Sequence, residues 1–156
     1  MDNSATHQSL DTQGGYPGWL NNFVEVYQQL STDNLDLLER IYHSDVLFED
    51  PMHKVHGYQN LNQYFATLYS NLSACTFRIN EVIPGDEQAA IYWQMQFSHP
   101  KLNGGDSVSV DGHSHIKQAQ GKVIYHRDYL DVGAMLYEHI PVVGRIIKAI
   151  KQRAGQ

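Results

Sequence analysis

The chain has 156 residues, a net charge of −6 and a pI near 5.8, and 42% of its residues are hydrophobic. This length suits one domain, and the apolar share is enough for a core that needs no disulfide staples. Because a negative chain lacks the basic field that replaces phosphate counterions, we expect no nucleic-acid partner. The one cysteine, Cys75, excludes an intramolecular disulfide and suits a reducing compartment, so the predicted location is cytoplasmic.

The composition divides the chain into three parts. Residues 1–15 are polar and lack the basic and apolar segments of a secretory signal, so we predict a disordered tail. Residues 16–132 are predicted to form the folded domain. Residues 133–156 have helical apolar spacing and, after His139, four basic and no acidic side chains, which predicts an added amphipathic basic helix. We expect this helix to pack on the domain, since one short basic helix is a weak membrane anchor.

The first half of the domain has the spacing of helices. Apolar side chains recur every three or four residues over 20–30, over 35–41 and over 58–72, which predicts three helices. A short strand is expected between the second and third helices, over 46–50, and it ends at Pro51 because proline cannot donate to a sheet ladder.

The second half has the period of strands. Alternation over 76–83, 89–97, 107–117 and 122–131 predicts four of them, separated by turns that contain Gly85, Gly104 and Gly121. Helices followed by an antiparallel meander predict an α+β fold, in which a curved antiparallel sheet wraps around the N-terminal helices.

Asp50 is the first candidate for chemistry. In a strand it lies on the same side as Val46 and Phe48, which would place its carboxylate in an apolar cavity. Desolvation there would suit a general base. The competing interpretation is that Asp50 closes a turn before Pro51. Alternation alone does not decide whether Asp50 or Glu49 faces the cavity.

Two further clusters lie on the predicted final strands. Asp111, His113 and His115 are spaced by two and share one side, but no second cluster offers further ligands, so we predict no metal site. His126 and Asp128 likewise share a side, and such a pair can shuttle a proton or orient water. The alternative for this strand is a surface array of ion pairs around its arginine.

The order of elements and several short motifs resemble the nuclear-transport-factor-2-like superfamily, in its SnoaL-like and ketosteroid-isomerase-like branch. The resemblance covers about Trp19 to Asp131 and rests on Leu35-Asp36, on Phe48-Glu49-Asp50-Pro51, on Gly57 and on Gly121-Lys122-Val123. It implies a cone-shaped domain with a small-molecule pocket and chemistry without a cofactor.

The resemblance also implies roles for single residues. Asp50 matches the proton-transferring base of ketosteroid isomerases, and His113 falls at the position of a hydrogen-bond donor in their oxyanion hole. Asp128 and its neighbours resemble the end of limonene epoxide hydrolases, although the charged pair that those enzymes need on an earlier strand is missing here. The predicted catalytic residues are therefore Asp50, His113 and Asp128. Ligand contacts are expected from Tyr27, Phe48, Trp93, His115 and His126.

Three functions fit these observations. The first is an isomerase or cyclase that moves a proton on a hydrophobic carbonyl compound. The second is a non-catalytic module for ligand binding or dimerisation, because this fold hosts both kinds of protein. The third is a hydrolase in which Asp128 activates water. A homodimer is expected through the outer sheet face, because Val108, Val110 and Ile116 are predicted to form an apolar patch there.

Overall fold

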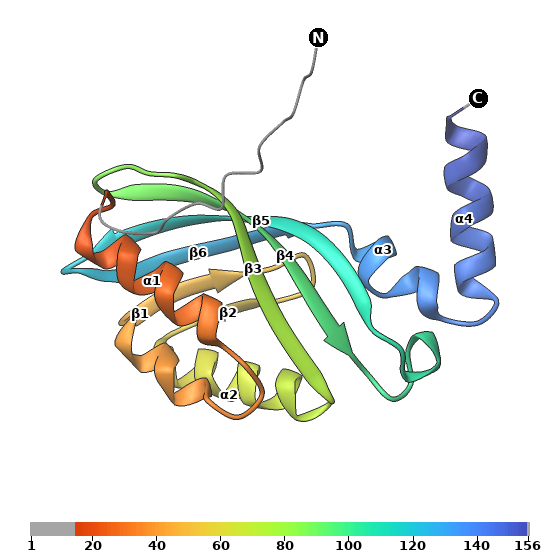
Figure 1. Cartoon of the computed structure of the whole chain (residues 1–156), viewed down its shortest axis with the longest axis horizontal. Helices are drawn as coiled ribbons and strands as arrows, with labels where there is room; N and C mark the ends of the chain where they lie inside the picture. Colours follow the sequence, from red (N-terminus) through yellow and green to blue (C-terminus); the bar gives the residue numbers. More distant parts are fainter. Residues whose placement is uncertain (1–14, 156) are drawn as a thin grey trace, which may run out of the picture.

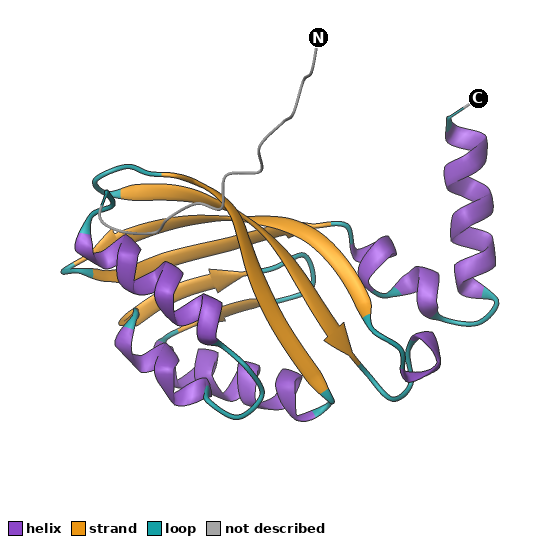
Figure 2. Ribbon diagram, in the orientation of Figure 1, coloured by secondary structure: helices purple, strands orange, loops and turns teal. Residues whose placement is uncertain are grey.

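The computed structural model describes residues 15–155, so the predicted tail over 1–15 lies outside the described residues except for Gly15. Figures 1 and 2 show helices packed against one face of a single curved sheet. The helical elements are α1 (Gly18–Gln29), η1 (Leu35–Arg40), α2 (Tyr58–Ser70), η2 (Asn103–Gly105), α3 (Val132–Met135), η3 (Tyr137–His139) and α4 (Val143–Ala154). The strands are β1 (Tyr42–Glu49), β2 (Lys54–His56), β3 (Ala74–Ile83), β4 (Gln88–Ser98), β5 (Val108–Ala119) and β6 (Lys122–Leu130).

The α+β fold and the curved, open sheet are confirmed. The strand order is β2-β1-β6-β5-β4-β3. The expectation of a wholly antiparallel sheet is wrong at one pair, because β1 and β6 run parallel. The reason lies in α2, which carries the chain from β2 to β3 at the opposite edge of the sheet. The strands β3 to β6 then return across the sheet, so that β6 lies beside β1 and runs in the same direction.

The core lies between the sheet and the two long helices α1 and α2. The predicted alternation of β4 is confirmed, since Ala89, Ile91, Trp93 and Phe97 are buried. On the neighbouring strand β5, Gly112 pairs with Trp93 of β4, and a Cβ atom at Gly112 would lie 2.3 Å from the indole ring. The missing side chain therefore leaves room for the indole to lie across β5.

We expect Gly112→Ala to destabilise the domain by about 1–3 kcal/mol, because the indole of Trp93 has to leave its position. Urea unfolding of the variant measures this loss. Ser109→Ala, on the exposed face of the same strand, is the matched control and should stay within about 0.5 kcal/mol of the parent. Equal stability of the two variants would mean that the indole does not depend on this gap.

The C-terminal segment is not the single helix expected over 133–156. α3 and η3 form short turns, the chain reverses at Pro141-Val142, where Val142 has φ +70°, and only then does α4 begin. The expectation that its apolar face packs on the domain is also wrong, since Ile146 and Ile150 are 54% and 57% exposed. Among the helices of the described part of the chain, none is long and apolar enough to cross a membrane.

Candidate functional site

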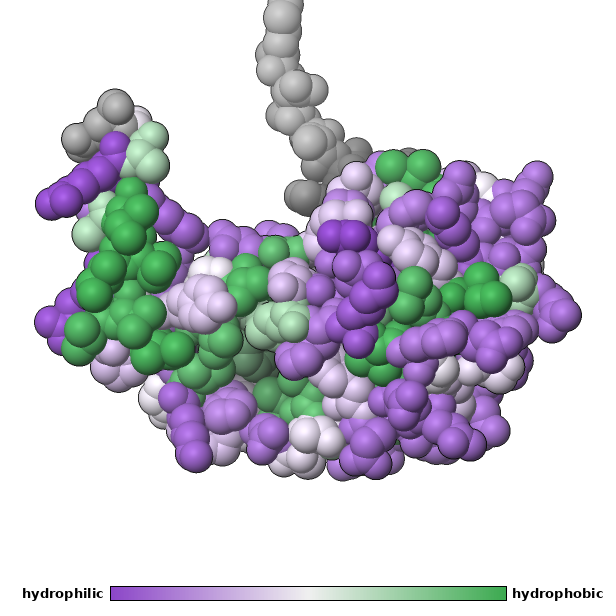
Figure 3. Space-filling view, turned by 180° about the vertical axis from the view of Figure 1, so that it is seen from behind, coloured by the Kyte–Doolittle hydropathy of each residue, from purple (hydrophilic) through white to green (hydrophobic). Residues whose placement is uncertain are grey.

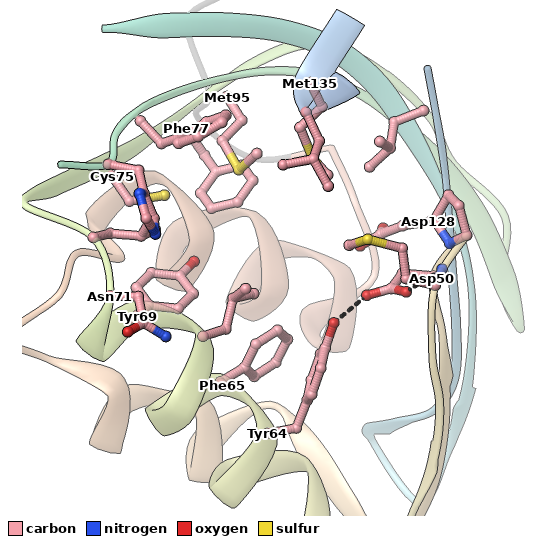
Figure 4. A pocket seen from close by; sticks show the side chains of 18 of the residues that line it. Asp50, Tyr64, Phe65, Tyr69, Asn71, Cys75, Phe77, Met95, Asp128 and Met135 are labelled. Atoms are coloured by element: carbon pink, nitrogen blue, oxygen red, sulfur yellow. Dashed lines mark hydrogen bonds between the residues drawn. The ribbon is translucent and has the colours of Figure 1, made fainter. Parts of the chain in front are cut away.

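A pocket of about 270 Å³ opens between α2, the sheet and α3 (Figure 4). This volume is close to the lower end of the range for ligand sites, about 300 Å³. Most of the wall is aromatic or otherwise apolar, and it includes Phe65, Phe77, Trp93, Met95, Phe97 and Met135. Two carboxylates, Asp50 and Asp128, interrupt this apolar wall. The geometry suits a small, mostly apolar molecule with one polar group.

Asp50 lies directly after β1 and on the side of the buried Phe48, as predicted, while Glu49 points outward and pairs with Arg127 at 3.4 Å. Its two oxygens are engaged. Oδ1 accepts hydrogen bonds from the backbone N–H groups of Met52 (2.8 Å) and His53 (2.7 Å), and Oδ2 accepts one from the hydroxyl of Tyr64. Both interpretations of Asp50 thus hold in part, because it lines the pocket and also closes a turn.

Asp128 has a different arrangement. Its Oδ1 accepts from the Ser114 hydroxyl at 2.5 Å and lies 2.7 Å from Nε2 of His126. Ser114 is itself fixed by the indole N–H of Trp93, which donates to its oxygen at 2.8 Å. Among the described residues, none donates to Oδ2 of Asp128. One carboxylate oxygen is therefore held rigidly, and the other is left for a ligand.

A buried chain of hydrogen bonds continues behind Asp128. Nδ1 of His126 lies 2.6 Å from the Tyr42 hydroxyl, which lies 2.6 Å from the Tyr27 hydroxyl. Within the described part of the chain, Tyr42 is the one hydrogen-bond partner of the Tyr27 hydroxyl. In the neutral tautomer that donates from Nε2 to the Asp128 carboxylate, Nδ1 of His126 accepts from Tyr42, and the Tyr42 oxygen accepts from Tyr27. In that tautomer every donor of the chain is directed toward the carboxylate.

The two tyrosines remain donors because of where they lie. Burial, followed by the negative charge of Asp128, raises the pKa of Tyr27, and burial likewise raises the pKa of Tyr42 well above its usual range. Both hydroxyls therefore keep their hydrogens at neutral pH and can donate along the chain that ends at Asp128.

The structure places His113 and His115 outside the pocket, contrary to the prediction. On β5 the inward side chains are those of the even-numbered residues, among them the buried Ser114, because Gly112 and Ser114 face Trp93. His113 instead stacks between two tyrosines of the outer face, with its ring 5.2 Å from Tyr92 and 4.8 Å from Tyr129. His115 contacts Gln88 on the same outer face.

Because the even-numbered side chains of β5 point inward, the structure also contradicts the predicted apolar patch on the outer face. Val108, Val110 and Ile116 are buried in the core, on the side opposite the histidines. The homodimer itself stays a prediction, now without the patch that suggested it. As for metals, no group of three or more His, Cys, Asp or Glu side chains is placed to hold an ion in the part of the chain that the structure describes.

Of the predicted ligand contacts, Phe48 and Trp93 line the pocket, whereas Tyr27 and His126 lie one layer behind it. Sequence reasoning did not identify Tyr64, Tyr42 or Ser114. Tyr64 lies three residues after the buried Leu61 on α2, so helical spacing alone could have predicted that it lies on the side facing the pocket. The contacts of Tyr42 with His126 and of Ser114 with Asp128 depend on which strands lie side by side, and periodicity in the sequence does not contain that information.

Cys75 offers a chemical probe of this wall. It lines the pocket at 3% exposure, and burial raises the pKa of its thiol to about 11. At pH 8 we expect alkylation by iodoacetamide to be slower than that of a free thiol by about 100-fold, because only the thiolate reacts. The rate should rise with pH toward a midpoint near 11. Mass spectrometry measures the alkylation rate directly, because the chain has one cysteine. Labelling of Cys75 as fast as that of glutathione would contradict the raised pKa.

Several solved structures share the fold of this chain. A protein assigned as a SnoaL-like polyketide cyclase from Jannaschia sp. CCS1 has a TM-score of 0.69 at 14% identity, covering 83% of this chain and 98% of that one. A protein of ketosteroid-isomerase-like fold from Catenulispora acidiphila DSM 44928, solved with trimethylamine, has a TM-score of 0.69 at 11% identity, covering 81% and 96%.

A third structure, TerC crystallised with polyporic acid, has a TM-score of 0.67 at 13% identity, covering 76% of this chain and 95% of that one. At these identities the likeness establishes the fold alone. No curated protein matches the chain in sequence. The family model of the SnoaL-like domain, however, matches residues 23–126, which is most of the folded part. The chain therefore belongs to the SnoaL-like domain family.

Proposed function

We propose that this protein binds a small, mostly apolar carbonyl compound and catalyses proton transfer next to its carbonyl group, with Asp128 as the base. The observation that carries the proposal is one carboxylate oxygen without a donor among the described residues, set in an apolar wall and backed by oriented donors. Membership of the SnoaL-like family supports the coarser statement that this is a small-molecule-binding domain.

Asp128 replaces Asp50 as the favoured base because of how their oxygens are used. Three donors occupy the oxygens of Asp50, and a carboxylate in that state has little capacity left for a substrate proton. The donors on Asp128 act on Oδ1 alone, which fixes the direction of Oδ2. A base must reach the substrate proton at hydrogen-bond distance, and Oδ2 is the oxygen that is available for this.

The proposed reaction needs no external reagent. Oδ2 of Asp128 takes a proton from the carbon next to the carbonyl, and the electron pair of that C–H bond moves to the carbonyl oxygen to form an enolate. After exchange with solvent, Asp128 returns a proton to the enolate carbon and the carbonyl group re-forms. The Tyr69 hydroxyl lines the pocket, and burial raises its pKa, so it stays a hydrogen-bond donor for the enolate oxygen. No cofactor is part of this scheme.

The test uses 2-tetralone, a bicyclic ketone with an acidic carbon next to its carbonyl. In D₂O, proton NMR should show faster loss of the hydrogens at that carbon with the protein than with buffer alone. Binding is followed in parallel by the indole N–H resonance of Trp93, which is told apart from that of Trp19 with Trp93→Phe. A shifted Trp93 resonance without faster exchange would overturn the catalytic proposal and leave a binding module.

A further inference from the structure

α4 carries an apolar surface that the pocket does not use. Val143, Ile146, Ile147 and Ile150 lie on one side of the helix, because their spacing of three and four residues returns to the same face. We call this set the α4 stripe. Ile146 and Ile150 are more than half exposed, and the stripe shows as a continuous hydrophobic surface along the helix in Figure 3.

The rest of the helix surface is basic. Arg145 and Lys148 lie on the side opposite the α4 stripe, whereas Lys151 and Arg153 lie at its two edges. α4 contains no acidic residue, although acidic residues outnumber basic ones by 17 to 11 in the whole chain. Such an arrangement, with cations on both edges of an apolar face, is typical of helices that lie in a membrane interface.

Specific contacts hold the α4 stripe away from the domain. Lys151 binds Asp131 at 2.9 Å and Glu138 at 2.6 Å, both in the segment that precedes α4. Gly144 lies so close to this segment that a Cβ atom there would be 2.2 Å from the carbonyl oxygen of Glu138. The helix thus uses one edge to contact its own chain, and it projects from the sheet domain in Figure 1.

We propose that the α4 stripe docks on an anionic membrane surface, with α4 lying in the plane of the interface. The isoleucine side chains enter the boundary between headgroups and acyl chains. Arg153, at the edge opposite Lys151, contacts lipid phosphates, and Arg145 and Lys148 add attraction to the anionic surface. The acidic domain does not prevent this, because charges farther than about 8–10 Å from the surface are screened at physiological salt. This inference rests on α4 alone and is independent of the proposed function.

A second copy of the chain is the competing occupant of the α4 stripe. It would have to offer an apolar surface of matching size. Outside the C-terminal segment, the described large apolar side chains that are exposed fall into small separate groups: Met52 and Leu68 line the pocket, and Tyr92 and Tyr129 flank His113 on the outer sheet face. The α4 stripe of a second copy is apolar as well, but it would bring four more basic side chains to the contact and no acidic ones. An anionic membrane supplies the opposite charge and is the favoured partner.

Cosedimentation with vesicles tests the inference. The full chain should pellet with vesicles of three parts phosphatidylcholine to one part phosphatidylglycerol at 0.1 M salt, and remain in solution with pure phosphatidylcholine. Ile146→Ser/Ile150→Ser should reduce the partition coefficient by about ten-fold or more, because apolar burial drives insertion. Arg145→Gln/Lys148→Gln should reduce it by several-fold, since each basic residue adds attraction to anionic lipid.

The matched control is Ala149→Ser/Gln152→Ser, which makes two changes to serine on the polar side of the same helix and should pellet like the parent. Circular dichroism of each variant checks that the domain is folded. Two results would overturn the inference. One is a parent chain that pellets with neither vesicle, and the other is a dimer in sedimentation equilibrium that the change at Ile146 and Ile150 dissociates.

Discussion

Asp128→Asn should lower the rate of ketone exchange by about 100- to 10,000-fold, the range that a general base contributes. The asparagine keeps an acceptor oxygen for Ser114 and His126, so the hydrogen-bond chain behind it can persist. What it lacks is a second oxygen that can take a proton. We therefore expect the unfolding free energy to change by no more than about 1 kcal/mol, and binding of 2-tetralone to remain.

The comparison with Asp50→Asn decides which carboxylate is the base. That variant loses the acceptor for the Tyr64 hydroxyl but keeps an oxygen for the backbone donors of the turn, so we expect a smaller fall, about ten-fold. NMR exchange rates of the two variants at equal ligand saturation give the answer. If Asp50→Asn stops exchange while Asp128→Asn preserves it, the base is Asp50 and not Asp128.

Tyr42→Phe should destabilise the domain by about 2–5 kcal/mol, although it removes a single oxygen atom. Tyr42 is both acceptor and donor, so its loss leaves the Tyr27 hydroxyl and Nδ1 of His126 without partners. Each unsatisfied buried polar group costs about 1–3 kcal/mol. Exchange should also slow, because His126 is then free to adopt the tautomer that does not donate to Asp128.

Tyr27→Phe is the informative partner of this variant. It removes the terminal donor and leaves one unsatisfied acceptor on Tyr42, so we expect a loss of only about 1 kcal/mol. In Tyr27→Phe/Tyr42→Phe the orphaned Tyr27 hydroxyl is gone, and the loss should be smaller than the sum of the two single losses. Urea unfolding measures all three. Additive losses would mean that the two hydroxyls are not coupled.

The sequence was sufficient to predict the helices and strands whose apolar spacing repeats over many residues. Helical spacing identified α1 and α2, and alternation identified β4 with its buried side, because one face of each meets the core. Alternation also placed Asp50 on the same side of β1 as Phe48, but it did not decide whether that side or the side of Glu49 faces the cavity. The histidines of β5 were assigned to the wrong face, since a strand with polar residues on both sides has no strong alternation. There, Gly112 and Ser114 were the inward residues.

The candidate site depends on contacts between strands that are far apart in sequence. His126 meets Tyr42 because β1 pairs with β6 in parallel, and this pair was not expected. Ser114 meets Asp128 across the register of β5 and β6. Neither register follows from local periodicity, so Asp128 was found as a candidate while the residues that orient it were not.

A crystal structure of the protein with bound 2-tetralone tests the central claim most directly. We predict the ketone inside the apolar wall, with the carbon next to its carbonyl about 3–3.5 Å from Oδ2 of Asp128 and with Oδ1 still bound by Ser114 and His126. A ketone whose reactive carbon lies against Asp50, or one bound outside the pocket, would contradict the account.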